Sequence, residues 1–176
     1  TALIIVLSPV WITAVIAIKL TSRGPVFFLQ DRGGQHGRIF QPWKFRTMRA
    51  CRRPDPLELI PLDHADITRI GWLLRRLKLD ELPQFINVLK GDMSLVGPRP
   101  HAVAHDEDYE RRILGYPRRL NMKPGITGWA QVNGLRGETD TVDKMRRRVE
   151  YDIYYIENWS LMFDVYIMLL TVASPK

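Results

Sequence analysis

Residues 79–84 read Leu-Asp-Glu-Leu-Pro-Gln, which places two adjacent carboxylates directly before an apolar run that stops at a glycine. Asp80 suits the N-cap of a helix and Pro83 suits its first turn, so we predict a helix that begins at Asp80 and ends near Gly91. A helix start carries free N–H groups and a partial positive charge, which favour an ionised aspartate and a phosphate group beside it. Asp80 is therefore a candidate nucleophile, or simply a cap, because aspartate is among the commonest N-cap residues.

The composition of the chain indicates one domain with anionic partners. Its 176 residues are 45% hydrophobic, which is enough for a sizeable core. The net charge of +7 favours nucleic acid, anionic lipid or phosphorylated small molecules as partners. The single cysteine, Cys51, cannot form an intramolecular disulfide, which favours a reducing, cytosol-facing location.

The first part of the chain indicates a membrane segment, because residues 2–18 carry no charge and are almost wholly apolar. As a straight helix they would extend about 25 Å, which is short of the roughly 30 Å hydrocarbon core of a bilayer. Proline in a helix interior removes a hydrogen bond, so we predict a re-entrant helix over residues 1–22 that is broken at Ser8 and Pro9. The alternatives are a spanning helix, a buried core helix and a signal peptide, which would need a basic start.

A second apolar stretch, residues 159–172, is too short to span a bilayer and contains a single charge, Asp164. Aromatic residues cluster just before it, and such residues favour the headgroup level of a membrane. We expect an interfacial helix there, with an ordinary core helix as the alternative. Residues 23–176 would then form a small catalytic domain that includes this helix, in a monotopic membrane protein of mixed α/β, helix-rich fold class.

The pattern between these two ends predicts short elements of both kinds. Strands are predicted at residues 26–29 and 39–40, on either side of a turn-rich segment. Helices are predicted at residues 67–77 and 141–156, where apolar residues recur at helical spacing. The proline-rich residues 49–61 are predicted to form an irregular loop.

Three further clusters suit a phosphate or nucleotide site. Lys44 and Arg46 alternate with apolar residues, so both cations would face one side of a strand. Arg99 stands between two prolines, which fix the backbone around a guanidinium suited to bidentate phosphate binding. Residues 123–134 combine three glycines with a tryptophan and two amides, which suits close approach to a base or sugar. Each cluster also has a purely structural alternative. Lys44 and Arg46 could lie on a solvated strand face, Arg99 could lie in a rigid turn, and residues 123–134 could form a tight structural loop.

In this order along the chain, the clusters resemble those of the bacterial sugar transferases, which are monotopic polyprenyl-phosphate phosphoglycosyl transferases. The resemblance rests on Ser8 and Pro9 and on residues 24–28, 30–37, 44–48, 79–84, 91–100 and 124–134. Residues 134–141 and 151–161 are most similar to the enzymes that prime exopolysaccharide synthesis with glucose-1-phosphate. The chain departs from the family at Lys78, where a small hydroxylated residue is usual, and in lacking basic residues before the membrane helix.

The resemblance implies a two-step reaction on the cytosolic face of the bacterial inner membrane. A UDP-sugar would give its sugar-1-phosphate, glucose-1-phosphate or alternatively galactose-1-phosphate, to undecaprenyl phosphate, with release of UMP. This step would start exopolysaccharide, capsule or O-antigen assembly. Asp80 would attack the sugar-bearing phosphorus to form an aspartyl-phosphosugar intermediate. Glu81 would act as a metal ligand or proton-transfer partner.

The resemblance also implies the groups that bind the metal and the substrates. Asp80 and Glu81 would bind Mg2+, whose charge would help to neutralise two anionic reactants. The implied phosphate contacts are Lys44, Arg46, Arg75 and Arg99, and the implied nucleotide-sugar contacts are Gln131, Asn133 and Arg136.

Larger family members carry an N-terminal multi-span membrane region. Because this chain opens inside an apolar run, we expect it to be the C-terminal part of a longer protein. We also consider a homo-oligomer. Two other function classes are a basic membrane-surface scaffold without chemistry and a nucleic-acid binder. The cations are interleaved with membrane-type segments rather than gathered on one helix, so we expect no nucleic-acid partner.

Overall fold

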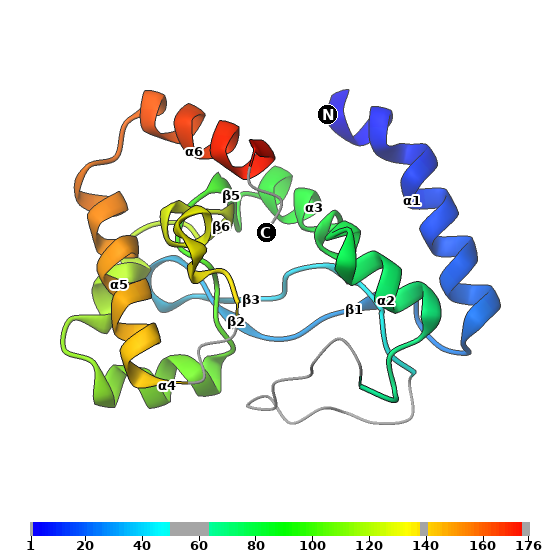
Figure 1. Ribbon diagram of the computed structural model, residues 1–176, viewed down its shortest axis with the longest axis horizontal. Helices are drawn as coiled ribbons and strands as arrows, with labels where there is room; N and C mark the ends of the chain where they lie inside the picture. Colours follow the sequence, from blue (N-terminus) through cyan, green and yellow to red (C-terminus); the bar gives the residue numbers. More distant parts are fainter. Residues whose placement is uncertain (1, 50–63, 138–140, 174–176) are drawn as a thin grey trace. The chain divides into compact units, whose positions relative to one another are not determined.

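The computed structural model describes residues 2–49, 64–137 and 141–173, which fall into two compact units. The N-terminal unit draws on residues 1–30 and 41–89, and the C-terminal unit draws on residues 31–40 and 90–176. The predicted mixed α/β, helix-rich fold class is confirmed, because the described residues contain six α-helices and three two-stranded ladders (Figure 1). The predicted loop at residues 49–61, including Cys51, lies almost entirely outside the described residues, as do residues 138–140.

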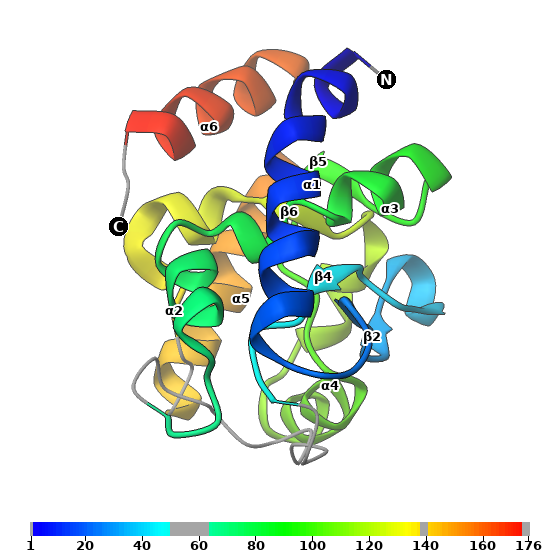
Figure 2. The same cartoon turned by 90° about the vertical axis from the view of Figure 1, so that its right-hand side faces the viewer.

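The N-terminal unit opens with α1 (Ala2–Thr21), which is one continuous helix with Pro9 inside it (Figure 2). The helix is uninterrupted across Ser8 and Pro9, so the predicted break there is not confirmed, and the re-entrant position stays a prediction. Proline removes one backbone hydrogen bond, and the rest of this long helix is retained. The Thr13 hydroxyl also donates to the Pro9 carbonyl at 2.8 Å. Among the residues described here, no helix combines the length and apolar character needed to cross a membrane.

A short antiparallel ladder packs against α1. In it, β1 (Phe27–Phe28) pairs with β4 (Lys44–Phe45), which confirms a strand within residues 26–29. Phe45 stacks on Phe27 at 5.6 Å and meets Trp11 of α1 edge-on at 6.0 Å. Ala14, Ile18, Phe45 and Leu74 are the fully buried members of this core.

The two helices that follow flank the carboxylate pair. Helix α2 (Arg69–Arg76) lies within the predicted residues 67–77, and its N-cap hydroxyl on Thr68 accepts from the Gly71 amide. Helix α3 (Gln84–Lys90) is followed by Gly91 at a φ of +83°, which confirms the predicted stop. Asp80, however, is not the N-cap of α3, because it lies inside a separate 3-10 turn, Leu79–Glu81.

Backbone conformation sets this turn apart from α3. Lys78, directly before the turn, has a left-handed φ of +58°. The Leu82 amide then donates to the Leu79 carbonyl at 3.2 Å, and the Phe85 amide donates to the Leu82 carbonyl at 3.1 Å. Both are i→i+3 bonds of the 3-10 type, so the chain turns tightly at Asp80 before α3 begins.

The C-terminal unit combines two small ladders with three helices. A hairpin pairs β2 (Arg32–Gly33) with β3 (Ile39–Phe40) around a short 3-10 segment, Gln35–Gly37. The other ladder is parallel and joins β5 (Ser94–Val96) to β6 (Gly125–Thr127). The remaining elements are α4 (Val103–Arg112), a 3-10 segment (Tyr116–Asn121), a π-helical turn (Gln131–Leu135), α5 (Val142–Glu157) and α6 (Leu161–Ala173).

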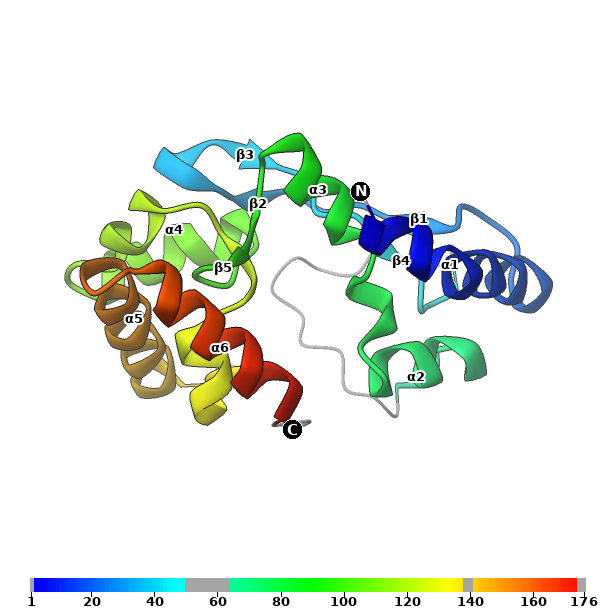
Figure 3. The same ribbon diagram turned by 90° about the horizontal axis from the view of Figure 1, so that it is seen from above.

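The last two helices confirm the helical predictions for residues 141–156 and 159–172. A short turn joins α5 to α6 (Figure 3). Met145 and Val149 of α5 and Ile167 of α6 are buried in the core of the unit. Leu161 and Val172 of α6 are 70% and 84% exposed, so one apolar face of α6 lies outside this core. The interfacial position of α6 stays a prediction.

Candidate active site

An ion pair in the N-terminal unit joins two of the sequence clusters. Lys44 comes from β4, and Glu81 comes from the 3-10 turn between α2 and α3. The Lys44 Nζ donates to Glu81 Oε1 at 2.8 Å, and the two side chains are only 21% and 11% exposed. The fold thus brings a cation from one motif against the carboxylate pair of another, 37 residues later.

Arg75 adds a second cation to this cluster. It lies near the end of α2, and its Nε donates to the Thr47 hydroxyl at 2.9 Å. Burial lowers the pKa of the Arg75 guanidinium, and the charge of Asp80 opposes that shift. Two of the predicted phosphate-binding cations, Lys44 and Arg75, therefore accompany the two carboxylates.

Asp80 lies half-buried among these charges. Burial raises the pKa of its carboxyl above the ordinary value, and the neighbouring charge of Glu81 raises it further. The charges of Lys44 and Arg75 act in the opposite direction and favour the ionised form. Asp80 is thus a partly desolvated carboxylate whose ionisation depends on nearby cations, as a nucleophile toward a phosphate ester requires.

The donor set fits Mg2+. Magnesium sites that handle phosphate groups are commonly built from one or two carboxylates together with substrate phosphates and water. Asp80 and Glu81 supply two adjacent carboxylates, and a divalent cation would relieve the repulsion that raises the pKa of Asp80. Within the described residues, no cluster of three or more His, Cys, Asp or Glu could hold a metal by itself. Substrate oxygens and water would therefore have to complete the shell.

Arg46 is placed differently from Lys44. Its guanidinium donates to the Arg23 carbonyl at 2.7 Å, and to the carbonyl and hydroxyl of Ser22 at 2.9 and 2.8 Å. Strand β4 ends at Phe45, and the Arg46 amide still donates to the Val26 carbonyl beside it at 2.8 Å. Its side chain instead holds the chain just after α1, and its predicted phosphate contact stays a prediction.

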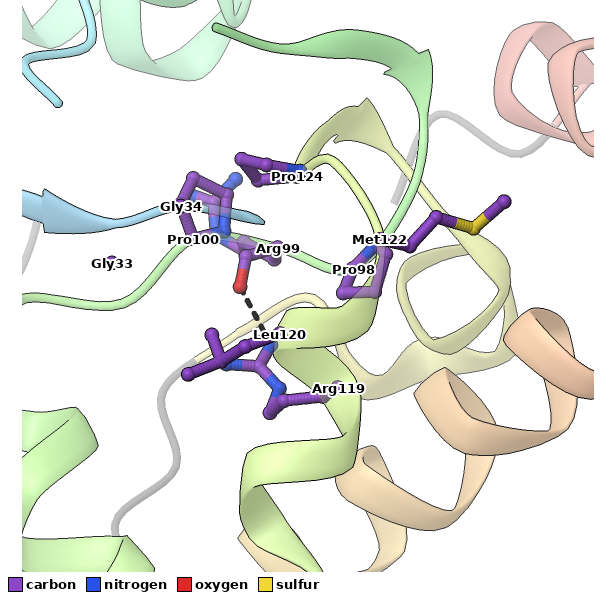
Figure 4. Close-up of a pocket in the computed structure, with 9 residues that line it drawn as sticks. All are labelled: Gly33, Gly34, Pro98, Arg99, Pro100, Arg119, Leu120, Met122 and Pro124. Carbon is purple, nitrogen blue, oxygen red and sulfur yellow. Dashed lines mark hydrogen bonds between the residues drawn. The ribbon is translucent and has the colours of Figure 1, made fainter. Parts of the chain in front are cut away.

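The backbone around Arg99 is anchored by hydrogen bonds to three consecutive carbonyls, those of Pro98, Arg99 and Pro100. In the C-terminal unit, the Arg119 Nη2 donates to the Arg99 carbonyl at 2.6 Å (Figure 4). The Arg32 Nη1 donates to the Pro100 carbonyl at 3.2 Å, and the Gly125 amide donates to the Pro98 carbonyl at 2.9 Å. A small pocket beside this segment is lined by Gly33, Gly34, Pro98, Arg99, Pro100, Arg119, Leu120, Met122 and Pro124.

The predicted nucleotide-sugar contacts lie in and just after the π-helical turn of the same unit. Gln131 is buried and donates through Nε2 to the Ile126 carbonyl at 3.2 Å. Its Oε1 is also buried and accepts no hydrogen bond from the described residues. Asn133 is exposed and donates to the Trp129 carbonyl at 2.8 Å, and Arg136 follows the turn directly. Gln131 thus offers a buried acceptor that a bound donor group would satisfy.

Comparison with known proteins shows the family. The family model described as "Bacterial sugar transferase" matches residues 1–175. This chain belongs to the bacterial sugar transferases. The resemblance inferred from the motifs is therefore confirmed.

Three relatives show what this sugar transferase is similar to. It is 52% identical over 172 residues to the "UDP-glucose:undecaprenyl-phosphate glucose-1-phosphate transferase" of Escherichia coli (strain K12), covering 98% of this chain and 37% of that protein. It is also 52% identical over 169 residues to a protein of the same name from Caulobacter vibrioides, covering 95% of this chain and 62% of that one. A "UDP-N-acetylgalactosamine-undecaprenyl-phosphate N-acetylgalactosaminephosphotransferase" of Aeromonas hydrophila is 43% identical over 167 residues, which cover 95% of this chain and 39% of that protein. The chain therefore spans less than two thirds of the length of each of these relatives.

Sequence reasoning missed one polar cluster of this sugar transferase. Arg148 and Asp152 of α5 are 4% and 2% exposed, and they share the buried side of the helix with Met145 and Val149. Their spacing in the sequence was the available signal, because residues four apart lie on one helix face. Charged residues at such positions are usually assigned to the surface, since they are rarely buried unless they are paired.

Proposed function

We propose that this chain transfers glucose-1-phosphate from UDP-glucose to undecaprenyl phosphate and releases UMP. The observation that carries the proposal is the carboxylate pair Asp80 and Glu81, held with Lys44 and Arg75 inside the segment matched by the family. Two relatives at 52% identity bear the name of a UDP-glucose:undecaprenyl-phosphate glucose-1-phosphate transferase, which supports the choice of sugar and lipid.

In the first step, a carboxylate oxygen of Asp80 attacks the phosphorus that bears the glucose. The bond from that phosphorus to the UMP oxygen breaks, and UMP leaves with the electron pair. Lys44 and Arg75 offset part of the negative charge that the carboxylate and the diphosphate bring together. The product on the chain is an aspartyl-phosphoglucose.

In the second step, a phosphate oxygen of undecaprenyl phosphate attacks the same phosphorus. The bond from phosphorus to the Asp80 oxygen breaks, which restores the carboxylate and yields undecaprenyl-diphosphoglucose. Asp80 must be ionised at the start of each cycle. Because burial raises its pKa, we propose that activity falls on acidification at a higher pH than for a solvated aspartate.

Asp80 and Glu81 are the groups proposed to hold Mg2+. When bound, the ion would neutralise charge on the phosphate oxygens of the substrate. Arg99, Gln131, Asn133 and Arg136 are proposed to bind the nucleotide sugar. The buried acceptor on Gln131 and the anchored backbone around Arg99 support these roles.

We propose that the chain works at the cytosolic face of the bacterial inner membrane. In α1, Ala14 and Ile18 face the protein core, whereas Ile12 and Ile16 are 60% and 53% exposed. Such an exposed apolar side suits insertion among lipids, and the exposed face of α6 suits the interface. A site held at this level would meet the phosphate of a long isoprenoid lipid.

A transfer assay tests the proposed function and the choice of sugar. The detergent-solubilised protein would be supplied with Mg2+, undecaprenyl phosphate and UDP-glucose, UDP-galactose or UDP-N-acetylgalactosamine, and UMP release would be measured. We expect the highest turnover with UDP-glucose and none above background for Asp80→Asn. Asp143→Asn, which changes an exposed aspartate on α5, is the matched control and should keep wild-type activity. No UMP from any of these sugars, or full activity of Asp80→Asn, would refute the proposal.

A further inference from the structure

Six polar and charged side chains form a buried network in the C-terminal unit. Each is at most 8% exposed, and the six residues are His101, Asp106, Tyr116, Arg119, Arg148 and Asp152. Burying a charged group is costly unless partners compensate for the lost water. Apolar residues could fill the same space at a lower cost, which favours a role for these six residues other than packing.

One end of the network holds the segment around Arg99. The Arg119 Nε and Nη2 both donate to Asp152 Oδ2, at 3.0 and 2.8 Å. The same Nη2 donates to the Arg99 carbonyl at 2.6 Å. A buried ion pair thus fixes the backbone of the very residue whose guanidinium is proposed to bind phosphate.

The other end holds the loop after the π-helical turn. The Arg148 Nε donates to the Leu135 carbonyl at 2.9 Å, and its Nη2 donates to the Gly137 carbonyl at 2.5 Å. Because both bonds come from one planar guanidinium, they constrain the position of this backbone more tightly than a single bond would. Arg136 lies between these two carbonyls, and Gln131 and Asn133 lie in the π-helical turn that ends at Leu135.

His101 lies between the two arginines. Its Nδ1 is 2.8 Å from Arg119 Nη1, and its Nε2 is 3.2 Å from Arg148 Nη1. A neutral imidazole has one acceptor nitrogen and one N–H, so only one of the two guanidiniums can donate to the ring. Burial and the surrounding arginines lower the pKa of His101 well below its ordinary value, which keeps the ring neutral. The Tyr116 hydroxyl donates to Asp106 Oδ1 at 2.6 Å, so it accepts from the Nδ1–H of His101 at 2.7 Å, and Nε2 is left to accept from Arg148. The Tyr116 hydroxyl also accepts from Arg119 Nη1 at 3.3 Å.

We propose that this network is a positioning device, in which Arg119 and Arg148, linked through Tyr116 and His101, hold the Arg99 segment and residues 131–137 in one fixed arrangement for the UDP-sugar. The proposal rests on the proposed function, in which these two segments bind the nucleotide sugar. The six residues are buried beneath the segments, so they act through them and not on the reacting atoms. Loosening either arginine, or the histidine between them, should disturb both segments together.

The two-step reaction separates a positioning role from a general role in stability. When the first product leaves before the lipid reacts, kcat/KM for each substrate reports on its own half-reaction. A network that positions the UDP-sugar segments would control kcat/KM for the UDP-sugar alone. A network that only stabilises the fold would change the amount of active protein, and both values of kcat/KM would fall by the same factor.

The kinetic test compares Arg148→Lys and His101→Gln with the wild type. Lysine keeps the charge at position 148 but loses the planar pair of donors. We expect kcat/KM for the UDP-sugar to fall at least about tenfold in both variants, with kcat/KM for undecaprenyl phosphate unchanged within about twofold. Arg147→Lys changes the exposed neighbour of Arg148 and should alter neither value. Equal falls in both values of kcat/KM would overturn the proposal.

Amide hydrogen exchange tests the physical link without any turnover. In Arg148→Lys, peptides covering residues 97–102 and 131–137 should both exchange faster than in the wild type, and in Arg147→Lys neither should change. Tyr116→Phe removes only a hydroxyl and gives a second, milder variant in case the others fold poorly. Faster exchange confined to residues 131–137 would overturn the link between the segments. A wild type that releases no UMP would instead refute the proposed function, while the exchange result still decides whether the network joins the segments.

Discussion

Replacing Lys44 by methionine tests the electrostatics of the carboxylate pair. The Lys44 ammonium lies 2.8 Å from Glu81 Oε1, and its charge lowers the pKa of Asp80. Methionine keeps an unbranched apolar stem but removes the charge. Because both side chains of the pair are mostly buried, water cannot fully replace the lost ammonium. We expect a loss of stability and a change in the pH dependence of UMP release.

The size of the stability loss follows from the geometry of the pair. At 2.8 Å and an effective dielectric constant of about 20, the Coulomb attraction is about 6 kcal/mol, and desolvation offsets most of it. Losing one partner of a fully buried pair costs about 3–5 kcal/mol, and exposed pairs contribute about 1 kcal/mol or less. This pair lies between those limits, so we expect a loss of about 2 kcal/mol. For a chain of this size that lowers Tm by roughly 4–8 °C.

The pH effect has a definite sign. Without Lys44, the pKa of Asp80 rises further, since burial and Glu81 already raise it and one opposing charge is gone. In the proposed mechanism Asp80 attacks in its ionised form, so the acid limb of the pH profile of UMP release should move to higher pH. Thermal unfolding and a pH series of UMP release would measure both effects, with Lys144→Met, an exposed lysine on α5, as control. An unchanged Tm and an unchanged acid limb would refute this view of the pair.

Three other perturbations address the end of α1, the buried histidine and the metal. Arg46→Met should lower Tm by roughly 4–8 °C, because carbonyls of Ser22 and Arg23 lose a buried donor, and thermal unfolding checks it. The folded pKa of His101 lies below its ordinary value of 6.5, so the stability it contributes is present above that pH and is lost as the pH falls. Denaturant titrations at several pH values below 6.5 would give the free energy of unfolding of the wild type and of His101→Gln. We expect the wild-type value to fall by up to about 1.4 kcal/mol per pH unit more than the value for His101→Gln. Equal pH dependence of the two values would contradict this. Chelation by EDTA should stop UMP release and added Mg2+ should restore it, whereas activity in EDTA would argue against the metal.

The carboxylate pair shows how far local patterns could reach. The apolar run and the glycine correctly predicted α3 and its end at Gly91, because both depend on neighbouring residues. The same local reasoning placed Asp80 at the cap of α3, and it missed the separate 3-10 turn that follows the left-handed Lys78. That Lys44 would reach Glu81 could not be predicted, because the contact depends on how distant segments pack.

Arg46 and the buried network show where patterns mislead. Alternation predicted that Lys44 and Arg46 both face phosphate, but in the structure the Arg46 guanidinium donates to the carbonyls of Ser22 and Arg23 just after α1. The buried network was invisible for a different reason. Its partners are far apart in the sequence, and the helical spacing that points Arg148 and Asp152 inward is outweighed by the general rarity of buried charge.

The most direct test of the central claim is to trap the covalent step on Asp80. The purified protein would be incubated with Mg2+ and UDP-glucose labelled at the sugar-linked phosphorus, with the lipid omitted, and the labelled peptide would be mapped by mass spectrometry. We predict that UMP is released, that the label stays on the peptide that contains Asp80, and that Asp80→Asn shows neither. Label on another residue, or UMP formed only when undecaprenyl phosphate is present, would contradict an aspartyl intermediate at this position.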